Sequence, residues 1–307
     1  RIHAVAINML IRAEGKVQTA MNMSIATALI NIGLNYLFMG VLDWGIAGAA
    51  WATVAAMVVF TILGYAYFLT GKANYAINPW SISLKSQYVK PLLAIGVSAA
   101  MLQIMFFVRQ STVFLMIKQY GTDWDIAFMG TSYRVMLLMM FPSFGFAIAY
   151  QPIAGINFGA KIIDRVGDGF KKFVYTSTAS IIVPWALVMI FPETVIGLML
   201  PEATLSMDDV FNFRIFISTL FLFPAFFMGT TLFQATGKAK LAGGITIFRD
   251  LLLFLPFTII LPMFFGVSGV YYVNIPVNII IIGLIVWVVN RQFKIWRKEM
   301  PSSRNKV

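Results

Sequence analysis

Eight runs of about 20 apolar residues constrain this chain more than any other feature of its sequence. At a rise of ~1.5 Å per residue, a helix of that length crosses the hydrocarbon core of a bilayer, which is about 30 Å thick. Transmembrane β-strands alternate in polarity over only about 10 residues, and these runs are longer and uninterrupted. The sequence therefore predicts an all-α polytopic membrane protein, with transmembrane helices at 20–42, 48–70, 91–118, 126–157, 173–200, 210–235, 241–264 and 268–290.

The fourth and fifth runs are longer than a bilayer requires, and both contain prolines. Proline removes a backbone donor and clashes with the preceding turn of a helix, so it kinks or ends the helix. We expect a kink or a helix end at Pro142 and Pro152 in the fourth run and at Pro184 and Pro192 in the fifth.

The composition disfavours the soluble alternatives and most catalytic ones. Hydrophobic residues make up 60% of the chain and charged residues only 11%, whereas soluble domains have roughly 45–50% and 25%. The sequence has no cysteine, and its one histidine is His3, near the start. Neither an H-E-x-x-H motif nor a phosphate-binding loop occurs, and the bases deep within the spans are arginines, which stay protonated. We therefore expect no enzyme activity, no metal site and no cofactor.

Basic and acidic residues alternate between successive loops. Lysines and arginines gather before the first span, in every second loop after it and behind the last span, whereas the other loops carry aspartate and glutamate. Because basic loops stay in the cytoplasm, both ends of the chain are predicted to be cytoplasmic, in an inner or plasma membrane. The net charge of +11 then reflects topology and contact with lipid headgroups, so the expected partner is the bilayer and not a nucleic acid.

Two short stretches occur twice. "AEGKVQTA" (13–20) matches "ATGKAKLA" (235–242) at an offset of 222, and "GIAG" (45–48) matches "GVSG" (266–269) at an offset of 221. The copies are six helices apart and so point the same way, which indicates a parallel duplication of six-helix bundles, an architecture typical of transporters.

The duplication predicts how the chain is divided. Residues 1–70 would hold the end of one bundle, namely the last part of a truncated fourth helix at 2–11 and the fifth and sixth helices. A cytoplasmic linker (71–90), a complete second six-helix bundle (91–290) and a basic cytoplasmic tail (291–307) would follow.

Several of these stretches resemble the multidrug and toxic compound extrusion (MATE) family, whose twelve helices form two bundles of six. The resemblance is carried by "IRAEGK" (11–16), "NIGLNYLFMGVLDWGIAGAAWAT" (31–53), "YRVMLLMMFPSFGFAIAYQPIAGINFGAK" (133–161), "FQATGKAK" (233–240) and "FRDLLLFLPFTIILP" (248–262). It implies a monomeric secondary active antiporter that exports lipophilic, mainly cationic drugs or toxins in exchange for protons or sodium by rocking of the two bundles.

The chain departs from the family at its acidic positions. Family members often have Asn, three residues and then Asp in the fifth helix, whereas here Asn31 is followed by Asn35, a neutral amide. Some relatives also have carboxylates in the seventh and tenth helices, but residues 91–118 and 215–237 contain none. The ion site of the family therefore does not transfer directly to this chain.

Charged residues within membrane spans are candidates for function. Counted along their helices, Arg109, Arg134, Arg249 and Asp250 are expected to converge near mid-depth. Asp250 is the only carboxylate at that depth, and it would either exchange a proton or sodium or form a structural ion pair. Neighbours on a helix point about 100° apart, so Arg109 or Arg134 is expected to pair with Asp250 better than Arg249 does.

Uncharged polar residues and the balance of charge leave alternatives open. Gln103, Gln151, Asn274 and Asn278 are candidates for binding, although hydrogen bonds inside the bundle explain each of them at least as well. Three arginines against one acid near mid-depth favour a second function, a flippase for lipid-linked anionic sugar precursors. A channel or a scaffold is disfavoured by the six-helix duplication.

Overall fold

The computed structural model describes residues 2–71, 73, 86–200 and 204–300. All the regular structure in these residues is helical, and the chain divides into two compact units, Arg1–Val89 and Lys90–Val307. The predicted linker at 71–90 lies largely outside the described residues.

The first unit is a small helical assembly. It contains α1 (Ile2–Ala13), α2 (Val17–Asn35), the π-helix η1 (Tyr36–Val41) and α3 (Gly45–Leu69). Its buried core is formed by aliphatic and aromatic side chains from these helices, including Ile7, Ile11, Phe60 and Phe68. Gly64 lets α1 approach α3 closely, because a Cβ there would overlap Cγ2 of Ile7.

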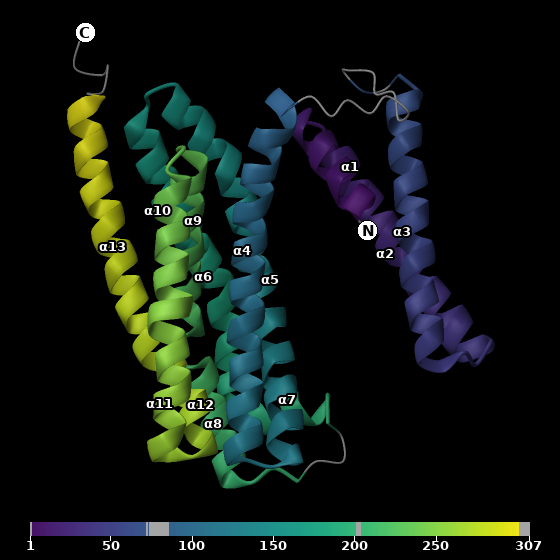
Figure 1. Cartoon of the computed structure of the whole chain (residues 1–307), viewed down its shortest axis with the longest axis vertical. Coiled ribbons are helices and arrows are strands. Elements are labelled where there is room, and N and C mark those ends of the chain that lie inside the picture. Colours follow the sequence, from purple (N-terminus) through teal and green to yellow (C-terminus); the bar gives the residue numbers. More distant parts are fainter. Residues whose placement is uncertain (1, 72, 74–85, 201–203, 301–307) are drawn as a thin grey trace. The chain divides into compact units, whose positions relative to one another are not determined.

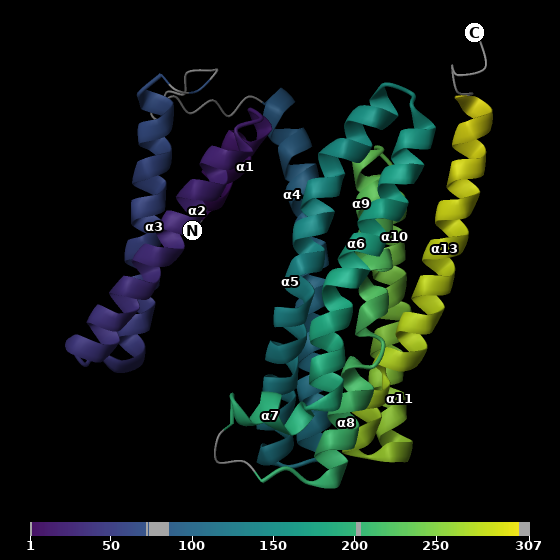
Figure 2. The same cartoon turned by 180° about the vertical axis from the view of Figure 1, so that it is seen from behind.

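The second unit contains long helices that run alongside one another (Figures 1 and 2). α5, α6 and α9 are mutual neighbours, and α13 packs against α9. α4 (Ser86–Tyr120) begins at the end of the first unit and continues into the second. The elements that follow are α5 (Asp123–Gly159), α6 (Ile163–Ile190), α7 (Pro192–Gly197), α8 (Met207–Ile217), the 3-10 helix η2 (Leu220–Leu222), α9 (Phe223–Ala235), α10 (Ala239–Ile247), the π-helix η3 (Phe248–Phe254), α11 (Leu255–Phe265), α12 (Val267–Tyr272) and α13 (Asn274–Glu299).

Seven segments within the described residues are long and apolar enough to cross a membrane, and they coincide with seven of the eight predicted spans. The remaining prediction, 91–118, forms α4, but many side chains in its first half lie outside those described, so its role as a span stays a prediction. The seven segments are Val17–Val41, Gly45–Leu69, Asp123–Gly159, Ile163–Ile190, Met207–Ala235, Ala239–Phe265 and Val267–Glu299.

Two helices extend well beyond a predicted boundary. α6 begins at Ile163, ten residues before the expected start at 173, so Arg165, Lys171 and Lys172 of the predicted loop lie on its exposed side. α6 also ends at Ile190, ten residues before the expected end at 200. α13 continues to Glu299, so the first part of the predicted basic tail is helical. Both helices extend because apolar side chains among the charged ones are buried, namely Ile163 and Val166 in α6 and Phe293 and Trp296 in α13.

The prolines have mixed effects on the helices. α6 ends at Ile190 and Pro192 starts α7, so the predicted break at this proline is confirmed. Pro142, Pro152 and Pro184 lie inside continuous helices, so none of them ends its helix.

Acidic residues of two predicted acidic loops cap helices. At the start of α5 the backbone N–H of Thr122 donates to Oδ2 of Asp125 over 2.7 Å. At the start of α8 the N–H of Ser206 donates to Oδ2 of Asp209 over 3.0 Å, and Oγ of Ser206 accepts from the N–H of Asp209. A carboxylate in the first turn satisfies free N–H groups and complements the helix dipole.

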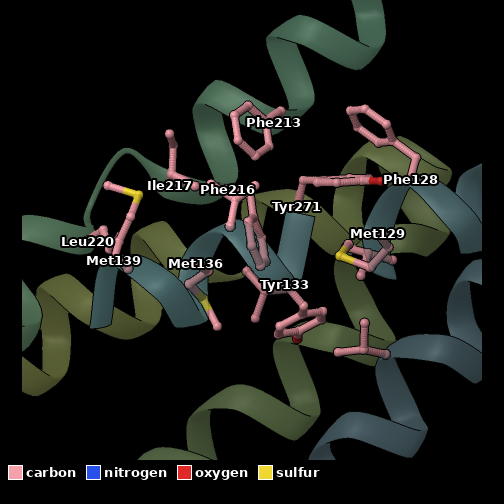
Figure 3. Close-up of a cluster of buried hydrophobic side chains, with 14 of the residues drawn as sticks. Phe128, Met129, Tyr133, Met136, Met139, Phe213, Phe216, Ile217, Leu220 and Tyr271 are labelled. Carbon is pink, nitrogen blue, oxygen red and sulfur yellow. The ribbon is translucent and has the colours of Figure 1, made fainter. Parts of the chain in front are cut away.

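An aromatic cluster joins α5, α8 and α12 (Figure 3). The ring of Tyr133 meets that of Phe216 edge-on with centroids 5.2 Å apart, and Tyr271 packs against both Phe128 and Phe216. Edge-on pairs of buried rings add to the stabilisation that burial itself supplies. The cluster anchors the part of α5 that also borders the cavity described below.

Candidate functional site

A π-helix places two adjacent charged residues inside the second unit. η3 interrupts the helical ladder between α10 and α11, and Arg249 and Asp250 lie in its first turn, 5% and 8% exposed. Pro256 follows in the second position of α11 and cannot donate to the backbone, which favours an irregular turn directly before it. Such π segments are rare in proteins as a whole, but those that occur are frequently found at functional sites.

Asp250 forms an ion-pair cluster with two arginines. Nη1 of Arg249 donates to Oδ1 of Asp250 over 3.1 Å, and Nη1 of Arg109, on α4, lies 3.7 Å from the same oxygen. The structure thus brings Arg109 to Asp250 as expected. The expectation that Arg249 would be the poorer partner is wrong, because its long side chain folds back onto its neighbour.

The two guanidinium groups also contact aromatic rings. Cζ of Arg109 lies 5.3 Å from the ring centre of Phe106 and 4.8 Å from that of Phe254. Cζ of Arg249 lies 5.0 Å and 4.8 Å from the rings of Phe223 and Phe226. Ring faces attract cations, so these contacts offset part of the cost of burying two positive charges.

Three guanidinium nitrogens of the cluster are buried without a hydrogen-bond partner among the described residues. They are Nε of Arg109 and both Nε and Nη2 of Arg249. Buried donors in folded proteins are nearly always paired, so a group of them at one place needs an explanation.

A cavity of about 650 Å³ adjoins this cluster, which is within the usual size range of small-molecule sites. Arg109, Arg249 and Asp250 are the charged residues in its described lining, so the lining carries one net positive charge. Its other residues are mainly apolar or aromatic: Phe106, Gln110, Tyr133, Met136, Leu137, Met140, Phe144, Phe223, Phe226, Phe227, Thr246, Phe254 and Asn274. Figure 3 shows Tyr133 and Met136 on their common helix.

Some predicted site residues lie away from the cavity. Arg134 is exposed and does not line the cavity, so the expected convergence of four charged residues is wrong for this one. Gln151 is likewise exposed and outside the lining. The side chain of Gln103 is outside those described. Asn31 and Asn35 belong to the first unit, where Nδ2 of Asn35 donates to Oδ1 of Asn31 over 3.0 Å.

Hydrogen bonds inside the unit account for the two asparagines of α13. Nδ2 of Asn274 donates to the backbone oxygen of Phe216 over 3.1 Å, and Nδ2 of Asn278 donates to Oγ1 of Thr219 over 2.7 Å. Asn274 also lines the cavity, so it combines a structural bond with a position at the candidate site.

The aromatic wall of the cavity is what the sequence interpretation missed. Phe106, Phe223, Phe226 and Phe254 contact the arginines, yet each stands in an apolar run where phenylalanine is unremarkable. The spacing of Phe106 three residues before Arg109 was a usable signal, because residues three apart share a helix face.

The MatE family model matches residues 98–260, more than half of the chain and including the charged cluster. The chain belongs to the MATE family. Among curated MATE relatives, multidrug export protein MepA of Staphylococcus aureus is 22% identical over 261 residues, which cover 85% of this chain and 57% of MepA. The chain therefore spans little more than half the length of the curated relatives that it matches.

Solved structures share the fold. A MATE crystal structure in a bent conformation matches with a TM-score of 0.84 at 21% identity, over 98% of this chain and 67% of that one. A MOP-superfamily transporter from Pyrococcus furiosus, described as having a binding pocket of reversed polarity that suggests a different function, matches with a TM-score of 0.83 at 21% identity, over 95% and 66%. At such identities the likeness establishes a MATE fold.

Proposed function

We propose that this MATE chain is part of a secondary active antiporter that exports lipophilic, mainly cationic drugs or toxins in exchange for protons or sodium. The observation that carries the proposal is a buried carboxylate, Asp250, beside a mostly apolar cavity in a chain of this family. Membership of the family and the likeness to a multidrug export protein support the export of organic compounds.

Asp250 would couple the ion to the movement of helices. Its Oδ1 is near guanidinium groups on both α4 and η3, and its Oδ2 accepts no hydrogen bond from the described residues. A proton or sodium ion bound by the carboxylate would compete with the arginines and weaken the link between α4 and η3. Ion occupancy would thereby change how these two helices pack.

The proposal includes a setting for the transporter. The working protein would be a monomer with two six-helix bundles in the inner or plasma membrane, with a cytoplasmic C-terminus and no nucleic-acid partner. The bundles would rock to alternate access to the cavity, as repeats of this kind do in other transporters.

The test is to reconstitute the full-length transporter in liposomes and follow a fluorescent lipophilic cation under an imposed proton or sodium gradient. We expect saturable transport that depends on one of the gradients, which would also identify the coupling ion. Transport that neither gradient drives would contradict the antiporter proposal.

A second candidate function is favoured by the charge of the cavity. Two arginines and one aspartate leave a positive charge, which suits an anionic guest better than a cation. We therefore keep a flippase for lipid-linked anionic sugar precursors as the alternative. It predicts that a fluorescent lipid-linked sugar diphosphate crosses the bilayer of the same liposomes while the cation does not.

A further inference from the structure

Arg109 and Arg249, which line the cavity, each have guanidinium N–H groups without an acceptor among the described residues. Arg249 uses Nη1 to bind Asp250, whereas its Nε and Nη2 are buried without a hydrogen-bond partner among the described residues. These two N–H groups lie on one edge of the guanidinium and point in the same direction. This edge is the fork that binds both oxygens of a carboxylate or two oxygens of a phosphate.

Arg109 adds a further donor to the same cluster. It lies 3.7 Å from Asp250, and its Nε has no hydrogen-bond partner among the described residues. One carboxylate thus serves two guanidinium groups, and the surplus positive charge is buried. A purely structural ion pair would need only one of the two arginines.

The rings around the arginines do not replace the absent acceptor. Phe223 and Phe226 contact Arg249, but phenylalanine has no oxygen or nitrogen to accept a hydrogen bond. The free edge of Arg249 is covered, so a guest must displace part of this aromatic cover to reach it. Binding then pairs buried donors that otherwise have no acceptor, and this pairing stabilises the complex.

From these contacts we propose that the cavity binds an organic anion, with its carboxylate or phosphate group on the free edge of Arg249 and its apolar body against the aromatic wall. The volume of about 650 Å³ leaves space for such a body beyond the charged end. Asp250 holds Nη1 of Arg249, so the bound anion would lie beside a negative charge that opposes its binding. This inference deepens the second candidate function, and it rests on that function only for the use of the cavity in transport.

The test compares three dansyl-labelled probes of equal chain length: an undecanoic acid, an undecanol and an undecylamine. Each is titrated into the purified full-length protein in neutral detergent, and dansyl emission gives the dissociation constant. We expect the acid to bind roughly tenfold more tightly than the alcohol, since hydrogen bonds to charged groups contribute that much. Equal affinities for the acid and the alcohol would overturn the proposal.

Variants locate the bound anion. Arg249→Gln should weaken the acid about tenfold and leave the alcohol unchanged, because only the acid uses the fork. Arg134→Gln is the matched control, since it removes an arginine that is exposed and outside the cavity lining. Equal effects of the two variants on the acid would also overturn the proposal.

Two further variants keep the test decisive if Arg249→Gln does not fold. Arg249→Lys keeps the charge without the fork and should give an intermediate affinity for the acid. Asp250→Asn removes the neighbouring negative charge, so it should tighten binding of the acid and weaken that of the amine. The opposite pattern, with the amine strengthened by Asp250→Asn, would contradict the assignment.

Competition with small anions identifies the source of the anionic group. Displacement of the acid probe by acetate or phosphate alone supports a site for free small anions, and its absence supports an amphiphile that needs the aromatic wall. The titration needs no ion gradient. The two proposals can therefore fail separately. A protein without gradient-driven export could still bind the acid more tightly than the alcohol, and a protein that binds both probes equally could still export.

Discussion

The two repeated segments, 13–48 in the first unit and 235–269 in the second, adopt the same turns. Gly15 and Gly237 both have positive φ, of 80° and 75°, and each stands one residue before a lysine that precedes a helix. Four residues beyond each lysine, Ala20 and Ala242 are fully buried. Glycine adopts positive φ without the steric cost that a Cβ imposes, which explains why this residue occurs at both turns.

The segments also end alike. Gly45 and Gly266 have φ of 54° and 57°, and three residues later Gly48 and Gly269 approach backbone closely. A Cβ would lie 3.0 Å from the backbone of Phe38 in the first case and 2.5 Å from that of Leu261 in the second. Both hairpins therefore need a residue without a side chain at this contact.

The segments differ between their turns. η1 lies at the end of the first segment's helix, directly before the turn, whereas η3 lies in the middle of the corresponding span. At an offset of 222, Arg249 and Asp250 occupy the positions of Thr27 and Ala28. Thr27 bonds within its own helix, with Oγ1 donating to the oxygen of Met23 over 2.8 Å. The repeat thus preserves backbone shape at the turns, and the second copy alone places a charged cluster between them.

The largest expected effect comes from removing the carboxylate that distinguishes the second copy. Asp250→Asn should abolish gradient-driven export by the full-length transporter, because a neutral amide cannot exchange a proton and binds sodium more weakly. Liposome flux of a fluorescent cation measures it. Asp123→Asn, at an exposed helix start, is the control and should transport normally. Normal export by Asp250→Asn would leave Asp250 with a structural role only.

The glycine contacts predict which of the two hairpins loses more stability when its glycine is replaced by alanine. Gly269→Ala should destabilise the protein by about 1–3 kcal/mol, because the new methyl group would overlap backbone that has little freedom to move. Gly48→Ala should cost less, since its contact is longer. Thermal unfolding in detergent measures both variants. Equal losses of stability, or a larger loss for Gly48→Ala, would contradict this order.

Replacing either turn glycine, Gly15 or Gly237, should lower the stability of the protein by a similar amount. Gly15→Ala and Gly237→Ala should each cost about 1 kcal/mol, since a Cβ disfavours positive φ. Apart from the adjoining chain, none of the described residues lies within 4 Å of a Cβ added at either position, so only the backbone strain contributes. Gly244→Ala, inside α10 with similarly open space, is the control and should be neutral or slightly stabilising. A clear difference between the two turns in thermal unfolding would break the structural equivalence of the repeats.

The smallest effect on transport is expected from a change in the first unit. Asn35→Leu removes the hydrogen bond between Asn35 and Asn31, which should cost about 0.5–1.5 kcal/mol of stability. Gradient-driven flux should nevertheless stay close to that of the unchanged protein, because the pair carries no exchangeable charge. A loss of flux as large as that of Asp250→Asn would move ion coupling into the first unit.

Sequence and structure agree best where the pattern is local. Seven spans followed from runs of apolar residues, and the acidic residues of the loops reappear as helix caps. The predicted start of α6 and the predicted end of α13 were wrong, because charged residues do not end a helix whose other face is buried. Periodic burial, as in Phe293 and Trp296, extends a helix beyond the point where hydropathy falls.

The site was predictable only in part. Asp250 stood out because carboxylates are rare within spans, and Arg109 followed as its partner. The contact with Arg249 was missed, because rotation along a regular helix does not describe a π turn or a long side chain that folds back. The aromatic wall was missed because phenylalanine is abundant throughout, at 28 residues.

The sequence by itself determined the class of protein, most of its spans and the paired turns, since hydropathy and glycine conformation act over a few neighbouring residues. Only the tertiary structure decided that Arg109 faces a buried carboxylate while Arg134 is exposed. Neither helix has a distinct polar face, so the sequence around these arginines does not indicate which side turns inward. Packing against neighbouring helices sets that rotation, and with it the cavity and its charge.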